Sequence, residues 1–143
     1  MPLDGKFNKG KIQHIHLWGS PEHFGDKELI RLLLKELVAA IGMTPHGEVS
    51  IHEYPTKELG FTATACVAVQ HLHESYVVYD NSIEYSPAYA NIVVNSCKPF
   101  DIAPALNVVN RILRPTSIRV SGADYYSPGT YFGGDEIGTS SSS

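Results

Sequence analysis

Residues 26–42 read DKELIRLLLKELVAAIG, and the segments that follow from residue 48 onward alternate polar and apolar positions. In the first stretch apolar side chains recur every three or four residues, which predicts an amphipathic helix with one buried face. Asp26 suits the N-cap and Gly42 suits the C′ position, so the helix is expected to fill this stretch. The predicted apolar face comprises Leu29, Ile30, Leu33, Leu34, Leu37, Val38 and Ile41.

The segments on either side of this helix have a period of two, which is typical of β-strands. They are rich in Val, Ile, Thr and Tyr, and residues such as Gly, Pro, Asn and Ser separate them. The predicted strands are Lys11–Trp18, Glu48–Tyr54, Phe61–Leu72, Tyr76–Tyr79, Ala90–Cys97 and Ser117–Val120, with a connection at Asn81–Pro87.

A second helix is expected after Asp101, because Pro104 fits its first turn and Pro115 ends it. The order strand, helix, several strands, helix, strand predicts an α+β two-layer sandwich. Two helices then cover one face of an antiparallel sheet. The other face carries many apolar and aromatic residues, so a homodimer formed through the sheet is expected to cover it.

The composition is that of one globular domain. The chain has 143 residues, of which 43% are hydrophobic and 18% charged. We expect the domain at residues 11–124, between a flexible lead (1–10) and a loose tail (125–143). The net charge of -4 disfavours a nucleic-acid partner. The sequence has only two cysteines, and it has no signal peptide and no apolar run long enough to cross a membrane. These features favour a cytoplasmic protein without a membrane partner.

Two consecutive segments carry a family pattern. Residues Glu74–Glu84 read ESYVVYDNSIE, and residues Tyr85–Cys97 read YSPAYANIVVNSC. Together they resemble the prokaryotic S-adenosylmethionine decarboxylases, in which E-S-H-x-S-x-H-T-x-P-E precedes an aromatic strand that ends in a cysteine. Residues Leu17–Gly19 also resemble the end of that family's first strand. The resemblance covers residues 11–120 and implies an S-adenosylmethionine decarboxylase-like fold.

The resemblance also implies a self-made cofactor. In that family a serine hydroxyl attacks the preceding carbonyl group, and the chain then breaks to leave a pyruvoyl group at the new N-terminus. By this resemblance the chain is cleaved between Glu74 and Ser75, and Ser75 becomes the pyruvoyl group. The implied activity is decarboxylation of S-adenosylmethionine for polyamine (spermidine) biosynthesis, with the ketone acting as an electron sink.

Further site residues follow from the same resemblance. Cys97 matches the family's catalytic acid, and Glu84 matches the glutamate that accepts hydrogen bonds from the ribose hydroxyls. Asp80 stands where the family has a histidine that assists processing. Tyr76, which replaces a second family histidine, Tyr85, Tyr79 and Tyr89 are candidates to offer ring faces to the adenine or the sulfonium.

A rival alignment changes the function. Counting without gaps from Gly60 places Gln70 at the serine position and Ser75 at the second histidine, so the chain would stay uncut. An uncleaved homologue that binds S-adenosylmethionine or another amino-acid ligand is therefore an alternative function. A non-catalytic oligomeric module is another.

Two histidine pairs raise the question of a metal site. His14 and His16 share one face of a predicted strand, as do His71 and His73. Two such pairs could hold zinc, but no acidic or cysteine ligand lies at a matching spacing, so no metal is predicted. Cys66 lies within an apolar strand and is predicted to be a core residue.

Overall fold

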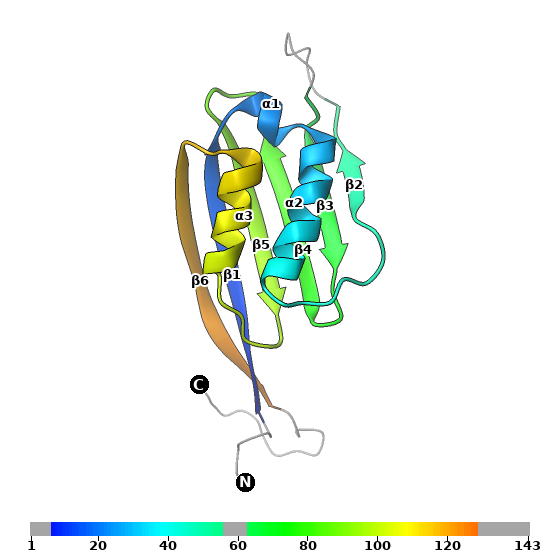
Figure 1. The fold of residues 1–143 in the computed structure, drawn as a ribbon, viewed down its shortest axis with the longest axis vertical. Helices are drawn as coiled ribbons and strands as arrows, with labels where there is room; N and C mark the ends of the chain where they lie inside the picture. Colours follow the sequence, from blue (N-terminus) through cyan, green and yellow to red (C-terminus); the bar gives the residue numbers. More distant parts are fainter. Residues whose placement is uncertain (1–6, 56–62, 129–143) are drawn as a thin grey trace.

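The computed structural model describes residues 7–55 and 63–128 of the chain. One layer is a six-stranded antiparallel sheet of order β2-β3-β4-β5-β1-β6, and helices cover one of its faces (Figure 1). The predicted α+β architecture is therefore confirmed. The strands are β1 (Phe7–Gly19), β2 (Ser50–Glu53), β3 (Cys66–His71), β4 (Ser75–Ser82), β5 (Ala88–Ser96) and β6 (Ser117–Pro128), and the helices are α1 (Pro21–Phe24), α2 (Lys27–Ala40) and α3 (Ala103–Leu113).

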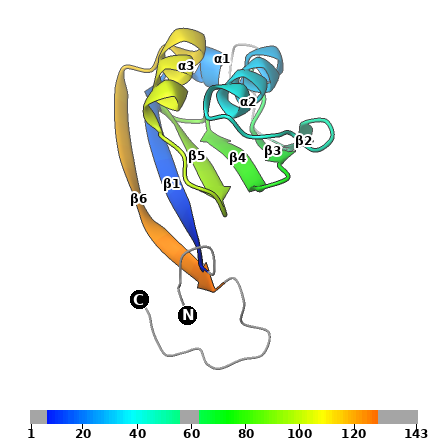
Figure 2. The same ribbon diagram turned by 60° about the horizontal axis from the view of Figure 1, so that its bottom comes forward.

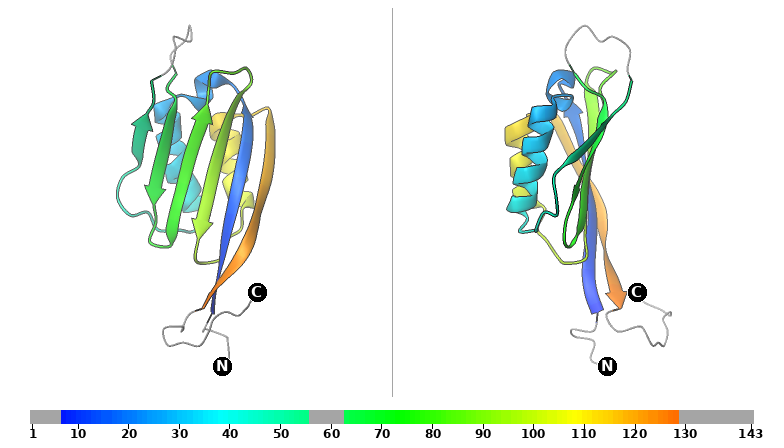
Figure 3. Two further views of the ribbon diagram at one scale, coloured as in Figure 1. Left: turned by 180° about the vertical axis from the view of Figure 1, so that it is seen from behind. Right: turned by 90° about the vertical axis from the view of Figure 1, so that its right-hand side faces the viewer.

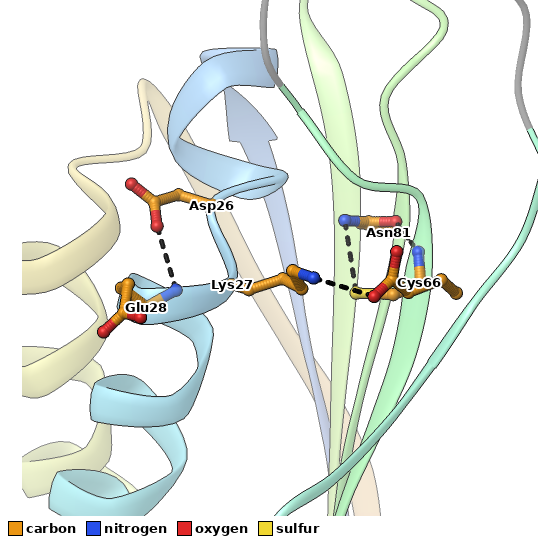
Figure 4. Close-up of polar contacts among 6 residues, drawn as sticks. Asp26, Lys27, Glu28, Cys66 and Asn81 are labelled. Carbon is orange, nitrogen blue, oxygen red and sulfur yellow. Dashed lines mark hydrogen bonds and ion pairs between the residues drawn. The ribbon is translucent and has the colours of Figure 1, made fainter.

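Helix α2 begins and ends where the sequence predicted. The Asp26 carboxylate accepts hydrogen bonds from the backbone N–H groups of Glu28 (2.9 Å) and Leu29 (3.2 Å), which satisfies two otherwise free donors. Figure 4 shows the bond to Glu28. Gly42 adopts a φ of 73°, a left-handed conformation that favours glycine just after a helix. These two residues set the length of the helix that packs over the centre of the sheet.

The core lies between the helices and the sheet. From Ile15 onward in β1, and throughout β5, every second residue faces the helices and is buried while its neighbours are not. The largest fully buried apolar side chains are Phe24, Ile15, Leu17, Ile30, Leu33, Leu34, Leu37, Ile83, Ile92, Leu113 and Val38. Cys66 is also fully buried, as predicted, and burial raises the pKa of its thiol to about 11.

Strand β6 is longer than the sequence indicated. It pairs with β1 from Phe7↔Pro128 to Trp18↔Ser117, so the pair includes residues 7–10 and 125–128 of the predicted lead and tail. The sequence had indicated only a short strand, Ser117–Val120. Glycine usually weakens a strand, yet the strand continues through Gly122. Here Gly122 has a φ of 149°, and a Cβ atom would meet the carbonyl oxygen of Ile12. Glycine thus permits the close approach of the two strands.

Other boundaries also shift. The short helix α1 was not predicted; Ser20 caps it and Pro21 occupies its first turn. Strand β3 begins at Cys66, and not at Phe61 as predicted. Residues 1–6, 56–62 and 129–143, which include Gly60 and Phe61, lie outside the described residues. Within the described part no helix has the length and apolar character needed to cross a membrane.

Asn81 belongs to β4 and not to the predicted connection. Its side-chain oxygen accepts a hydrogen bond from the backbone of Cys66 at 2.9 Å (Figure 4). Its amide nitrogen donates to the carbonyl oxygens of Phe24 (2.8 Å) and Thr64 (3.0 Å), and the Tyr79 hydroxyl also donates to Phe24 (2.7 Å). This buried network joins β4 to α1 and to the segment that enters β3.

The two ends of the sheet carry different turns, and in the described part of the chain only one of its two faces is covered by helices. The β3–β4 turn and the chain leaving β5 lie at the lower end in Figure 1, and the β4–β5 connection lies at the upper end. Figure 2 shows the helices packed together on one side of the sheet. The opposite face carries no helix among the described elements (Figure 3); we call it the open face.

Candidate active site

The predicted cleavage site lies in a tight turn. His73 and Glu74 form the turn between β3 and β4, and the N–H of Leu72 donates to the carbonyl of Ser75 at 2.9 Å. Ser75 is the first residue of β4, is half-buried and lies opposite Ser96 of β5. The peptide bond between residues 74 and 75 is therefore at the exit of a turn and not in the middle of a strand.

Residue 97 lies beside that peptide bond. The backbone N–H of Cys97 donates to the carbonyl oxygen of Glu74 at 3.1 Å, which extends the β4–β5 ladder by one step into the turn. The Cys97 residue is exposed, and its thiol is free. The structure therefore brings together three of the predicted site residues, Glu74, Ser75 and Cys97.

The side chain of Glu74 is held from two sides. One carboxylate oxygen accepts the backbone N–H of Thr44 at 3.0 Å, and the other lies 3.6 Å from the Lys98 ammonium. The hydrogen bond from Thr44 is the main reason that the pKa of Glu74 lies below its ordinary value, and Lys98 lowers it further. The residue that precedes the predicted cleavage bond is thus anchored as an anion.

Asp80 and Glu84 lie away from this turn within one chain. Asp80 lies five positions along the strand from Ser75, about 16 Å away, and the alternation of β4 places their side chains on opposite faces. Glu84 lies in the exposed β4–β5 connection, beyond the far end of a strand about 23 Å long. One molecule therefore does not bring all the predicted catalytic and binding residues into one site.

The predicted tyrosines fall into different environments. Tyr76 is half-buried on the open face next to Ser75, opposite His71 and Asn95. Tyr85 lies in the β4–β5 connection and is 69% exposed. Tyr79 is fully buried on the helix side and has no free ring face, so its suggested stacking role is wrong.

Gln70, the processing position of the rival alignment, is buried within β3. Its amide nitrogen donates to the carbonyl oxygens of Gly47 (3.0 Å) and His71 (2.9 Å). This side chain therefore has a structural role that explains its burial, since buried amides need hydrogen-bond partners.

An aromatic cluster on the open face was only partly foreseen. His16 stacks between His14 (5.9 Å between ring centroids) and Trp18 (6.5 Å), and Tyr89 lies beside them. The two ring nitrogens of His16 contact the hydroxyls of Tyr89 at 2.8 Å and Ser121 at 3.1 Å. Burial, Arg119 and His14 lower the pKa of His16. The spacing of two residues had indicated the histidine pair but not the tryptophan and tyrosine.

His71 and His73, the other predicted pair, do not lie together on one face. His71 faces the open side of β3, whereas the His73 ring lies 5.4 Å from that of His46. Within residues 7–55 and 63–128, no three His, Cys, Asp or Glu residues are placed to hold a metal ion.

Replacing Asp80 by asparagine is expected to stabilise the protein at neutral pH. Burial raises the pKa of Asp80, so the folded state binds the proton more tightly than the unfolded state. The carboxylate therefore costs stability above its folded pKa, and this cost disappears below its unfolded value. We expect Asp80→Asn to raise the free energy of unfolding at pH 7 by on the order of 0.5 kcal/mol, after solvent screening.

Urea denaturation at pH 7 and pH 3 checks this expectation. The gain from Asp80→Asn should be present at pH 7 and absent at pH 3, while the exposed Glu22→Gln serves as control. An equal gain at both pH values would contradict the argument.

Comparison with known proteins supports the fold. No known protein-family profile matches the sequence, and no curated protein sequence matches it significantly. Among solved structures, the chain is similar to the crystal structure of the adenosylmethionine decarboxylase from Aquifex aeolicus VF5. The TM-score is 0.62, with 90% of this chain and 98% of that chain covered at 18% sequence identity. The likeness confirms the predicted S-adenosylmethionine decarboxylase-like fold.

Proposed function

We propose that this chain is a self-cleaving, pyruvoyl-dependent decarboxylase of S-adenosylmethionine, processed between Glu74 and Ser75. The observation that carries the proposal is the 3.1 Å hydrogen bond from the Cys97 N–H to the carbonyl oxygen of Glu74. This contact between residue 97 and the carbonyl group of residue 74 supports the proposed roles of Cys97 and of the Glu74–Ser75 bond, and so does the similarity of the fold to that of an adenosylmethionine decarboxylase.

The turn suits the first step of cleavage. When the Ser75 hydroxyl attacks the Glu74 carbonyl carbon, negative charge develops on the carbonyl oxygen. A backbone donor that already points at this oxygen stabilises that charge without reorganisation. The anchors of the Glu74 side chain at Thr44 and Lys98 hold the other side of the bond in place.

The residues of the turn fit a pyruvoyl group at position 75. Such a group supplies a ketone that accepts electrons when the substrate carboxylate leaves. The Cys97 residue is exposed beside this position, so its thiol can return a proton to the substrate carbon. Lys98 follows directly and, with Glu74, makes this end of the sheet polar.

A complete site needs two copies of the chain. Asp80 and Glu84 lie too far from Ser75 in the same molecule, by the strand distances given above. We therefore propose a homodimer in which the open faces pack together, so that Asp80 and Glu84 of one protomer approach the turn of its partner. The half-buried Trp18 and Tyr89 on that face suit such an interface.

Intact-mass spectrometry of the purified protein tests the proposal. The wild-type chain of 15.7 kDa is expected to appear as two fragments, residues 1–74 and 75–143. Ser75→Ala removes the attacking hydroxyl and is expected to leave the chain whole. Ser82→Ala, at the other end of the same strand, is the matched control and should be cleaved normally.

An intact wild-type chain would remove the pyruvoyl proposal. Thermal unfolding with S-adenosylmethionine would then separate the two alternatives. A ligand present at 100 times its dissociation constant adds about 2.7 kcal/mol of stability, which an uncleaved binding protein would show. A non-catalytic module would show neither cleavage nor this stabilisation.

A further inference from the structure

We propose that the imidazoles of His46 and His73 transfer the protons during cleavage of the Glu74–Ser75 bond. In the family pattern a histidine assists this processing, and Asp80 stands at its position in this chain. The inference rests on the proposed function and assigns residues that the resemblance did not include.

Both histidines are fixed to the cleavage turn. His73 is itself a turn residue, two positions before Ser75, and its N–H donates to the Thr44 carbonyl at 3.0 Å. The N–H of His46 donates to the His71 carbonyl at 2.8 Å. Their rings lie 5.4 Å apart and are tilted by 55°. Two segments distant in sequence therefore place an imidazole pair on the turn that contains the bond to be cut.

Asp80 cannot serve the same turn within its own chain, because about 16 Å of strand separate it from Ser75. Histidine is also the better group for the task, since it accepts and releases protons near neutral pH. Glu74, Lys98 and Cys97 lie at the same turn, where both Lys98 and the backbone of Cys97 contact Glu74. His71 is set apart because it faces the open side of the sheet.

The pair would act in two steps, formation of the ester and its elimination. An imidazole takes the Ser75 hydroxyl proton as Oγ bonds to the Glu74 carbonyl carbon. The same proton goes to the Ser75 nitrogen as the C–N bond breaks, which leaves an ester. An imidazole next takes the Cα proton of Ser75, and the Oγ–Cβ bond breaks to release the Glu74 carboxylate. The resulting dehydroalanine takes up one water and releases ammonia, and residue 75 is left as the pyruvoyl group.

The test follows cleavage of the full-length chain after a pulse of cell-free synthesis. His73→Ala and His46→Ala are compared with wild type and with His71→Ala, an exposed histidine on the same strand end. We expect at least one of the first two variants to be cleaved about 100-fold more slowly. His71→Ala should match wild type. Imidazole added to the buffer should restore cleavage in the slow variant.

The hydrogen bonds that hold both histidines to the turn are backbone bonds, so they survive these substitutions. His73→Asn is made in parallel because asparagine favours turns, and it should be as slow as the alanine variant. Rates within twofold of wild type in every variant overturn the inference and leave the proposed function standing. Slow cleavage that imidazole does not restore also overturns it. A wild-type chain that stays whole, like Ser75→Ala, removes both.

Discussion

Replacing Asn81 by leucine is expected to lower the free energy of unfolding by about 3–4 kcal/mol. Leucine has a similar size but cannot hydrogen-bond, so the Thr64 carbonyl and the Cys66 N–H lose their contacts with this side chain. Each buried group left unpaired costs about 1–3 kcal/mol. The Phe24 carbonyl is spared because Tyr79 still donates to it. Urea denaturation at 25 °C measures the loss.

Asn110→Leu provides the control, because this asparagine is exposed on α3. Its effect should remain within about 0.5 kcal/mol, as for most surface substitutions. If Asn81→Leu cost no more than this control, the buried network would have no net stabilising value.

Asn81 also shows where the sequence was insufficient. Asn81 is followed by serine and lies five residues before Ser86-Pro87, a pattern typical of a connection, so the local sequence placed it there. Its hydrogen-bond partners lie 15, 17 and 57 residues away in sequence. A side chain whose role depends on distant partners cannot be recognised from the residues beside it.

Elements specified by near neighbours were predicted well. The Asp26 cap, the apolar face of α2 and Gly42 lie within one helix, and the structure has them as expected. The adjacency of Ser75 and Cys97 was implied by the family pattern and follows physically from two antiparallel strands joined by a short connection. The residue periodicity and the order of the strands were therefore enough to predict the fold and the proximity of Ser75 and Cys97.

The rest of the candidate site could not be predicted from local sequence patterns. The pairing of His46 with His73 depends on how the chain after α2 passes the β3–β4 turn, which no local pattern encodes. The separation of Asp80 and Glu84 from Ser75 follows from the length of β4, which the sequence underestimated as Tyr76–Tyr79. The family pattern implied one common site for Ser75, Asp80 and Glu84, but these residues do not lie together in one molecule.

Co-expression of two inactive variants is expected to restore decarboxylation if the site spans two protomers. Ser75→Ala cannot form the pyruvoyl group. Glu84→Gln should lower activity about 100-fold or more, because it weakens hydrogen bonds to a charged acceptor. In a mixed dimer one site has Ser75 from one chain and Glu84 from the other. Random pairing makes half of the dimers mixed with one good site each, so about a quarter of wild-type activity should return.

The matched control is co-expression of Ser75→Ala with Cys97→Ala. Both residues lie at the same turn of one chain, where the Cys97 N–H meets the Glu74 carbonyl, so no mixed dimer contains an intact site. Release of carbon dioxide from carboxyl-labelled S-adenosylmethionine measures both unfractionated mixtures, and pull-down through two different affinity tags checks that mixed dimers have formed in each. Restored activity in the control mixture, or none with Glu84→Gln, would contradict a site shared between the turn of one protomer and the open face of the other. The contrast between the two mixtures is decisive because strand geometry separates Glu84 from Ser75 but leaves Cys97 beside it.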